Sequence, residues 1–248
     1  MKSTYLSNDV RRWFHEQIAA HPNTKYRVTL AHKNIFSGSG HSVDTETPMF
    51  REIMLPILKE CEIDLAIQGH DHCYEVIGPV NPDTRTVVEG AVADVRDTTY
   101  NANKNMTGKV GGTFTTDQGT LYFIGATCGR KRYYPYTREE MNANYDKHKV
   151  TNYFDLFTSM FGQPGAPSFT KFTVKNDCIE LNSYTASSTG QATLFNTMKV
   201  VRNTPHTWSG IEQIDATKLA DGTKFIRDNQ ILIRKDGKTY NVLGIEVE

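Results

Sequence analysis

The chain has 248 residues, of which 38% are hydrophobic and 23% charged, a size that allows one large domain or one domain with a small appendage. Its 28 basic side chains balance its 28 acidic ones, so no overall field favours nucleic acid or an anionic membrane, and we expect no nucleic-acid partner. No stretch approaches the roughly 18 consecutive apolar residues of a membrane span, and the first residues, MKSTYLSNDVRRWF, lack the apolar segment of a secretory signal.

Four cysteines are scattered along the chain without a C-x-x-C pair. They are Cys61, Cys73, Cys128 and Cys178. Their spacing predicts neither a thiolate zinc site nor a disulfide framework.

In chain order, residues 7–22 predict an amphipathic helix and residues 25–32 a buried strand. A loop rich in Gly and Ser, KNIFSGSGHS, precedes a helix over residues 47–61, for which Thr47 is the expected cap. Residues 62–70 then predict a second strand. Strand, helix and strand in this order predict a crossover unit of a mainly parallel sheet, whose chemistry lies at the carboxyl ends of the strands.

Beyond the second strand the pattern changes to shorter strands with polar connections. The predicted segments are RTVVEGAV, GTLYFIGATCG, SFTKFTVKNDCIELNSYTAS and TMKVVRN. Asn176-Asp177 predicts a hairpin turn, and residues 137–161 a helical stretch in two pieces. Residues 204–222 resemble a linker, and residues 223–248 predict a small antiparallel appendage. The sequence thus predicts a mixed α/β chain with an appended β-hairpin.

Histidines stand at both strand ends of the crossover unit. His32 ends the first strand, and the second is followed by Gly69, His70, Asp71 and His72. In an extended segment, side chains two apart point the same way with Cα atoms about 6.6 Å apart. We therefore expect His70 and His72 to face metal, Asp71 to point away, and Gly69 to permit close backbone approach. Asp71 or a backbone carbonyl would fix a ring tautomer. The alternative is a polar surface loop.

These residues carry a resemblance to a known family. GHDHCYE resembles the G-H-x-H element of calcineurin-like metallophosphoesterases, and VTLAHKNIFSGSGH resembles the preceding histidine-bearing strand and loop, most of all in the purple acid phosphatase branch. The resemblance covers residues 7 to about 203, so residues 1–203 are expected to be the C-terminal portion of such a domain. It implies a layered β-sandwich with flanking helices. Thr29 replaces a usual valine, and a usual proline after the strand histidine is absent.

The resemblance also implies residue roles. His32 and His70 would bind one metal ion and His72 a second, the metal being zinc, iron or manganese. A metal-bound hydroxide would attack the phosphorus of a small phosphoester, and His41 would protonate the leaving group. The alternative for His41 is a solvated loop histidine.

The carboxylate motifs of the family are missing from the sequence. It contains no Gly-Asp dipeptide and no Gly-Asn-His, although a bridging carboxylate is what holds two cations about 3.5–4 Å apart. The nearest spare carboxylates, Asp44, Glu46 and Asp64, match no family ligand. We expect a chain without its N-terminal layer, holding zero or one metal ion and weakly active or inactive alone. The uncovered sheet edge predicts a homo-oligomer or a complementing N-terminal half.

The alternative to an enzyme is a non-catalytic remnant that serves as a binding or scaffold module. GRKRYYPYT, residues 129–137, is interpreted as a solvated loop over the sheet end; the alternative is that its cations and tyrosines steer a phosphate or stack a base. The ending GKTYNVLGIEVE resembles the sorting tails of exported proteins of some Gram-negative bacteria, which favours an extracytoplasmic location; its alternative is a plain terminal hairpin.

Overall fold

The computed structural model describes residues 2–97, 109–148, 153–207, 222, 224–227, 230–242 and 244–247. The chain divides into two compact units, one of which is Thr24–His206. The other combines Met1–Asn23 with Thr207–Glu248. The predicted boundaries at residues 203 and 222 remain a prediction, and most of the expected linker lies outside the described residues.

The first sheet of the Thr24–His206 unit carries the predicted crossover. Its strands, in spatial order, are β1 (Val28–Leu30), β2 (Leu65–Gln68), β7 (Thr120–Gly125), β3 (Tyr74–Asn81) and β4 (Thr86–Val87). β1, β2 and β7 are parallel, β3 runs antiparallel to β7, and β4 runs antiparallel to β3. Helix α2 (Glu46–Glu60) connects β1 to β2, which confirms the expected crossover. The short helix η1 (Gly40–Val43) precedes α2.

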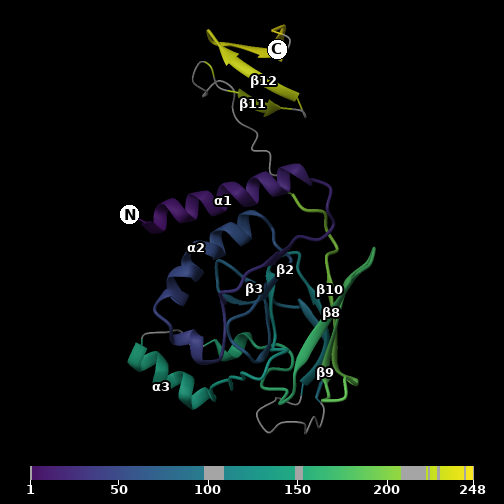
Figure 1. The fold of residues 1–248 in the computed structure, drawn as a ribbon. Coiled ribbons are helices and arrows are strands. Elements are labelled where there is room, and N and C mark those ends of the chain that lie inside the picture. Colours follow the sequence, from purple (N-terminus) through teal and green to yellow (C-terminus); the bar gives the residue numbers. More distant parts are fainter. Residues whose placement is uncertain are drawn as a thin grey trace. The chain divides into compact units, whose positions relative to one another are not determined.

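A second sheet packs against the first. Its strands, in spatial order, are β5 (Val92–Asp97), β6 (Lys109–Thr115), β10 (Ala192–Val201), β9 (Ile179–Ala186) and β8 (Ser168–Val174). Figure 1 shows the first sheet lying between this sheet and α2. Both sheets contribute fully buried side chains to one core, among them Leu65, Tyr74 and Phe123 from the first and Leu181 and Met198 from the second. The mixed α/β class is therefore as expected.

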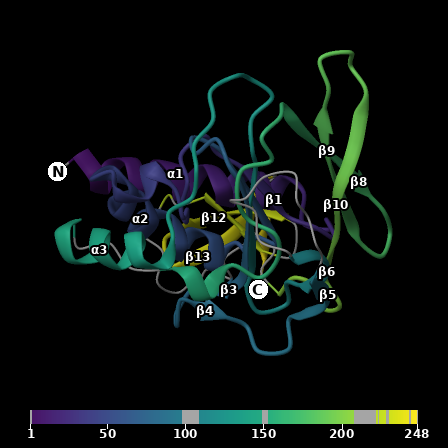
Figure 2. The same cartoon turned by 90° about the horizontal axis from the view of Figure 1, so that it is seen from below.

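Two helical pieces lie between β7 and β8, as predicted for that stretch. They are α3 (Arg138–His148) and η2 (Phe154–Leu156), and Figure 2 shows α3 on the same side of the first sheet as α2. The turn expected at Asn176-Asp177 is confirmed, because β8 and β9 pair antiparallel from Val174↔Ile179 onward.

Two strands and one helix cap differ from the prediction. Strands β3 and β6 were not predicted, because Gly78-Pro79 and Gly111-Gly112 indicate turns in the sequence. In the structure they lie within the strands, with positive φ at each glycine. The N-cap of α2 is Thr45, not Thr47. The hydroxyl of Thr47 instead donates to the backbone oxygen of His41 at 2.8 Å.

The remaining elements belong to the other unit. Helix α1 spans Lys2–Ala20, so it begins before residue 7, where the sequence pattern placed its start. The C-terminal sheet has the order β11 (Lys224–Arg227), β12 (Gln230–Lys235), β13 (Lys238–Asn241) and β14 (Glu246–Val247), all antiparallel. Asp236 and Gly237 form its central turn with φ of 50° and 73°, which suits a two-residue hairpin. The turn expected at Asp228-Asn229 lies outside the described residues.

None of the helices that the structure describes is both long enough and apolar enough to cross a bilayer.

Candidate functional site

His32 and His70 meet at the carboxyl ends of neighbouring parallel strands. His32 lies two residues beyond β1 and His70 two residues beyond β2. Nε2 of His32 is 3.1 Å from Nδ1 of His70. A Cβ at position 69 would lie 3.3 Å from the backbone oxygen of His32, so Gly69 permits this approach, as the sequence predicted. Parallel pairing has brought together two histidines 38 positions apart.

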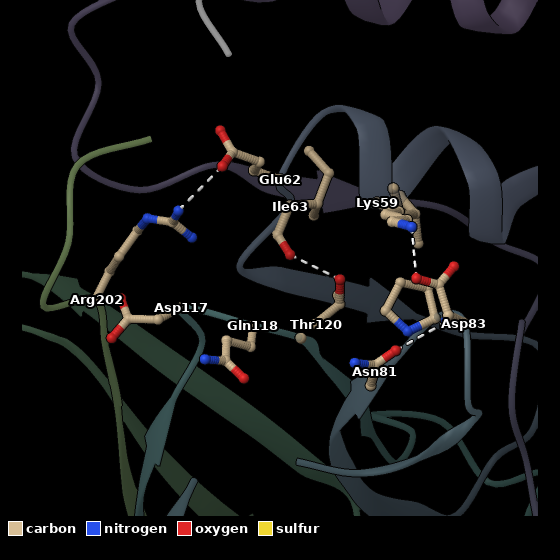
Figure 3. Close-up of a pocket in the computed structure, with 12 residues that line it drawn as sticks. Lys59, Glu62, Ile63, Asn81, Asp83, Asp117, Gln118, Thr120 and Arg202 are labelled. Carbon is tan, nitrogen blue, oxygen red and sulfur yellow. Dashed lines mark hydrogen bonds and ion pairs between the residues drawn. The ribbon is translucent and has the colours of Figure 1, made fainter. Parts of the chain in front are cut away.

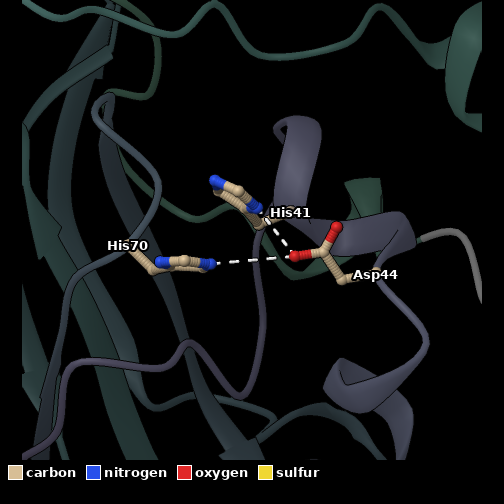
Figure 4. A group of neighbouring side chains, drawn as sticks. All are labelled: His41, Asp44 and His70. Atoms are coloured by element: carbon tan, nitrogen blue, oxygen red, sulfur yellow. Dashed lines mark hydrogen bonds and ion pairs between the residues drawn. The ribbon is translucent and has the colours of Figure 1, made fainter.

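His41 joins this pair from the loop between β1 and α2. Its ring stacks on that of His70, with centroids 3.7 Å apart and planes inclined by 30°. Asp44 accepts a hydrogen bond from Nδ1 of His41 at 2.7 Å, and the same oxygen lies 3.7 Å from Nε2 of His70 (Figure 4). Among the described residues, His41, Asp44 and His70 form a group whose ligand atoms all lie within 4.8 Å of one another.

His72 is fixed in one tautomer by the backbone. Its Nδ1–H donates to the carbonyl oxygen of Lys131 at 2.9 Å, so Nε2 keeps its lone pair. This is the usual arrangement of a metal-binding histidine. Tyr133 lies beside both His72 and His41, with ring centroids 4.8 and 5.2 Å away. The segment interpreted as a solvated loop thus forms one wall of the histidine group.

Lys33 is a further neighbour of His70. Its Nζ lies 3.1 Å from Nε2 of His70 and donates to Glu46 at 2.9 Å. Burial, together with the charges of His41, Lys33 and His32, lowers the pKa of His70. A histidine with a lowered pKa is neutral at pH 7, which a metal ligand must be.

The turn that carries His70 is not extended. His70 has φ of 72°, a left-handed conformation that is uncommon for a residue with a side chain and costs about 1–3 kcal/mol. The prediction that residues 70–72 are extended, with His70 and His72 on the same side of a strand, was therefore wrong. Asp71 does point away from the imidazoles, but into the protein, where it is 1% exposed.

Asp71 connects the turn to the loop that bears His41, residues 33–45. Its carboxylate accepts the backbone N–H of His41 at 3.1 Å, the amide of Asn34 at 3.1 Å and the hydroxyl of Ser37. A buried carboxylate is stable only when such donors surround it. Asp71 therefore positions His41 through the backbone, and the carbonyl that fixes a ring tautomer belongs to Lys131.

A second carboxyl, that of Glu75, lies beneath Asp71. It is fully buried and accepts hydrogen bonds from the N–H of Gly38 at 3.2 Å and from the thiol of Cys73 at 2.9 Å. Burial, reinforced by the charge of Asp71, raises the pKa of Glu75 to about 8. The hydroxyl of Ser37 lies within hydrogen-bond distance of both carboxyls but has one hydrogen. When Glu75 is protonated, its own hydrogen can form the hydrogen bond between Glu75 and the Ser37 hydroxyl, while the hydroxyl donates to Asp71.

The same loop is held by other buried groups. The side-chain oxygen of Gln68 accepts the N–H groups of Ile35 and Phe36. The guanidinium of Arg51 donates to the backbone oxygen of Ile35 at 2.7 Å and lies over the ring of Phe36. Residues 34–39 are all buried, so the loop is part of the folded core despite its Gly and Ser content.

The donor set fits one metal ion. Zn–N distances of about 2.0–2.1 Å and tetrahedral angles place two ligand nitrogens about 3.3 Å apart, close to the 3.1 Å between His32 and His70. Within the described residues, the group that meets at His70 contains one carboxylate, Asp44. The residues fit a single cation better than a carboxylate-bridged pair.

The other acidic residues near this motif have different roles. Asp64, at the opposite end of β2, is fully buried and pairs with Arg202 at 3.1 Å and His206 at 3.0 Å. That end of the sheet also has a cavity of about 200 Å³, lined by charged side chains that pair with one another, such as Lys59 with Asp83 (Figure 3). Neither feature contacts the histidine group.

Sequence reasoning missed Asp44, Lys33, Tyr133 and Glu75 as members of the site. The spacing of His41 and Asp44 by three residues was a usable signal, because η1 turns both side chains to one side. Tyr133 belongs to the cluster of cations and tyrosines at residues 129–137, which the sequence analysis interpreted as a solvated loop, and Lys33 carried no such signal. The four cysteines, whose pairing the spacing left open, have free thiols in the structure.

Comparisons with known proteins point to one group of enzymes. No family model matches the chain. Over 92 residues, 36% of its length, the chain is 30% identical to "Purple acid phosphatase 3" of Arabidopsis thaliana, of which the match covers 23%. This similarity supports a relationship to the purple acid phosphatases. The chain spans less than a quarter of that relative.

A solved structure, that of purple acid phosphatase PPD1 from yellow lupin (Lupinus luteus) seeds, overlaps 77% of this chain and 28% of its own. The TM-score is 0.45 and the sequence identity 16%, an overlap too loose to transfer any site residue.

The buried Glu75 predicts a pH dependence of stability. Its carboxyl is protonated below about pH 8 in the folded chain but only below about pH 4.5 when unfolded. Between these values the folded state holds the extra proton, so this residue makes the chain less stable as pH rises, by up to about 1.4 kcal/mol per pH unit. Glu75→Gln removes this contribution. Urea unfolding of both proteins at pH 5 and pH 8 measures it.

The exposed Glu89 provides the control, because Glu89→Gln should follow the unmodified chain at both pH values. Equal pH dependence of the unmodified chain and Glu75→Gln would show that Glu75 is already ionised at neutral pH.

Proposed function

We propose that the chain carries the histidine part of a metal-dependent phosphoesterase site. His32, His70 and His72 are the metal ligands in this proposal, and His41 is the general acid. The metal is zinc, iron or manganese. The convergence of His32, His70 and His41, with Nε2 of His32 3.1 Å from Nδ1 of His70, carries the proposal. The similarity to Purple acid phosphatase 3 supports the reaction class.

A metal ion bound here would supply Lewis acidity and a water of lowered pKa. The chain's own residues do the rest. The neutral ring of His70 and the backbone-fixed tautomer of His72 offer lone pairs. Asp44 holds Nδ1–H of His41 at 2.7 Å, which directs Nε2 of that ring outward. An imidazole held in this way can donate a proton to a departing oxygen near neutral pH.

The substrate in this proposal is a small phosphoester. The described group contains a single carboxylate, so we expect one metal ion per chain and slow turnover. A specific observation also favours the alternative, a non-catalytic binding or scaffold module. Both ring nitrogens of His70 are engaged by protein groups, His32 and Lys33. Metal content and turnover distinguish the two functions.

The first experiment measures zinc content and hydrolysis of p-nitrophenyl phosphate with zinc, manganese or iron. We expect about one ion per chain and slow, metal-dependent hydrolysis that falls at least about 10-fold in His70→Ala. His21→Ala, an exposed histidine outside this unit, is the matched control. Hydrolysis that persists in His70→Ala, or a chain that retains no metal, would contradict the proposal.

The role of His41 predicts a dependence on the leaving group. A general acid matters little for p-nitrophenolate, which departs without a proton, and much for an alkoxide. His41→Asn should therefore lower kcat for an alkyl phosphate by about 100-fold or more and leave p-nitrophenyl phosphate nearly unchanged. An equal loss on both substrates would assign His41 to binding instead.

We also propose self-association through β1. This strand is the edge of the first sheet, and its Val28 and Leu30 are 46% and 79% exposed. An exposed apolar edge strand readily pairs with another chain. A complementing N-terminal half is the alternative partner for the same edge.

Light scattering after size-exclusion chromatography tests the edge. Leu30→Lys should shift the chain to a smaller species, whereas Val174→Lys, at a position 70% exposed on the edge strand β8, should not. A monomeric unmodified chain would contradict self-association.

An extracytoplasmic location remains a proposal that the ending of the sequence supports, and fractionation of the source cells tests it.

A further inference from the structure

One edge of the His70 ring already faces a cation, the ammonium of Lys33. Nζ lies 3.1 Å from Nε2 of His70 and 2.9 Å from Oε1 of Glu46. An ammonium group has hydrogen-bond donors and no acceptor, so Nε2 must be the acceptor. The proton of the neutral ring is then on Nδ1.

We propose that Lys33 sets the tautomer of His70 and thereby opposes metal binding by His32 and His70. This inference rests on the proposed function, because it concerns the same metal site. Nδ1 of His70 faces Nε2 of His32 at 3.1 Å. With its proton in place, Nδ1 donates to His32 and has no lone pair for a cation. A metal ion between the two rings needs the lone pairs of His32 Nε2 and His70 Nδ1.

Asp44 offers the opposite arrangement. Its oxygen lies 3.7 Å from the same Nε2 of His70, and an ionised carboxylate only accepts hydrogen bonds. When Nε2 donates to Asp44, Nδ1 is free to bind metal, which is the usual pattern of a histidine ligand held by a carboxylate. Lys33 and Asp44 therefore compete for one ring edge and favour different states of the site.

Glu46 holds Lys33 in the opposing position. The Lys33 and Glu46 side chains are 35% and 48% exposed, and an ion pair this accessible contributes little stability by itself. Lys33 can therefore swing into solvent at small cost. The site has a resting state in which the chain's own cation caps His70 and a binding state in which that cation has left.

Zinc titration of Lys33→Met by calorimetry tests the inference. The substitution removes the donor and one positive charge while keeping an unbranched side chain. We expect the Kd for zinc to fall at least about 10-fold, as for loss of a hydrogen bond to a charged group. Lys59→Met, an exposed lysine of α2 that pairs with Asp83, should leave the Kd unchanged. Lys33→Ala provides a second variant.

Imidazole ¹⁵N spectra of the metal-free proteins give a readout independent of activity. The unmodified chain should show His70 protonated at Nδ1, and Lys33→Met should shift the population toward Nε2. Adding His32→Ala to Lys33→Met should abolish the gain in zinc affinity, because the vacated edge is the one that His32 shares.

Three results would overturn the inference. They are an unchanged or weaker zinc affinity in Lys33→Met, a gain that survives His32→Ala, and no zinc binding by either protein. The survival of the gain would place the cation beside His41 and Asp44 instead. Failure of the proposed function would give a different result from failure of this inference. In that case Lys33→Met would still bind zinc more tightly than the unmodified chain, but neither protein would hydrolyse phosphoesters.

Discussion

The histidine group depends on one buried carboxylate, that of Asp71. It lies between His70 and His72 in the sequence, yet it turns inward and accepts the backbone N–H of His41. The loop of residues 33–45 and the turn after β2 are thereby fixed to each other. Removing the donors of a buried carboxylate is costly, so the N–H of His41 stays on Asp71. This contact holds His41 over the ring of His70. The arrangement of His41 and His70 therefore depends on an internal hydrogen-bond network.

The sequence predicted which histidines lie close together better than it predicted the backbone and contacts that position them. Parallel strands joined by a helix place their carboxyl ends together, and this rule alone brought His32 near His70. Alternation along an extended strand was the wrong guide after β2, because His70 adopts a left-handed backbone conformation. Whether a residue leaves the extended region at such a turn depends on tertiary contacts, here those of Asp71 and Glu75, which no local pattern encodes.

The unpredicted members of the site share a physical reason. Lys33 and Tyr133 reach the histidines from loops whose course is set by tertiary contacts. Arg51 of α2 binds the backbone of the first loop at Ile35, and the ring of His72 donates to the Lys131 carbonyl of the second. Strands β3 and β6 were missed for a related reason, since Gly78-Pro79 and Gly111-Gly112 break pairing patterns locally while the sheet continues through them. The crossover, the hairpin at Asn176-Asp177 and the mixed α/β class needed only local signals and were predicted.

The central proposal is that His32 and His70 hold a cation between their facing ring nitrogens at the ends of β1 and β2. A crystal structure of the zinc-soaked protein, with anomalous diffraction recorded at the zinc edge, measures this directly. The account predicts an anomalous peak within ligand distance of His32 Nε2 and His70 Nδ1. A peak elsewhere on the chain, or none beside these two nitrogens, would contradict it.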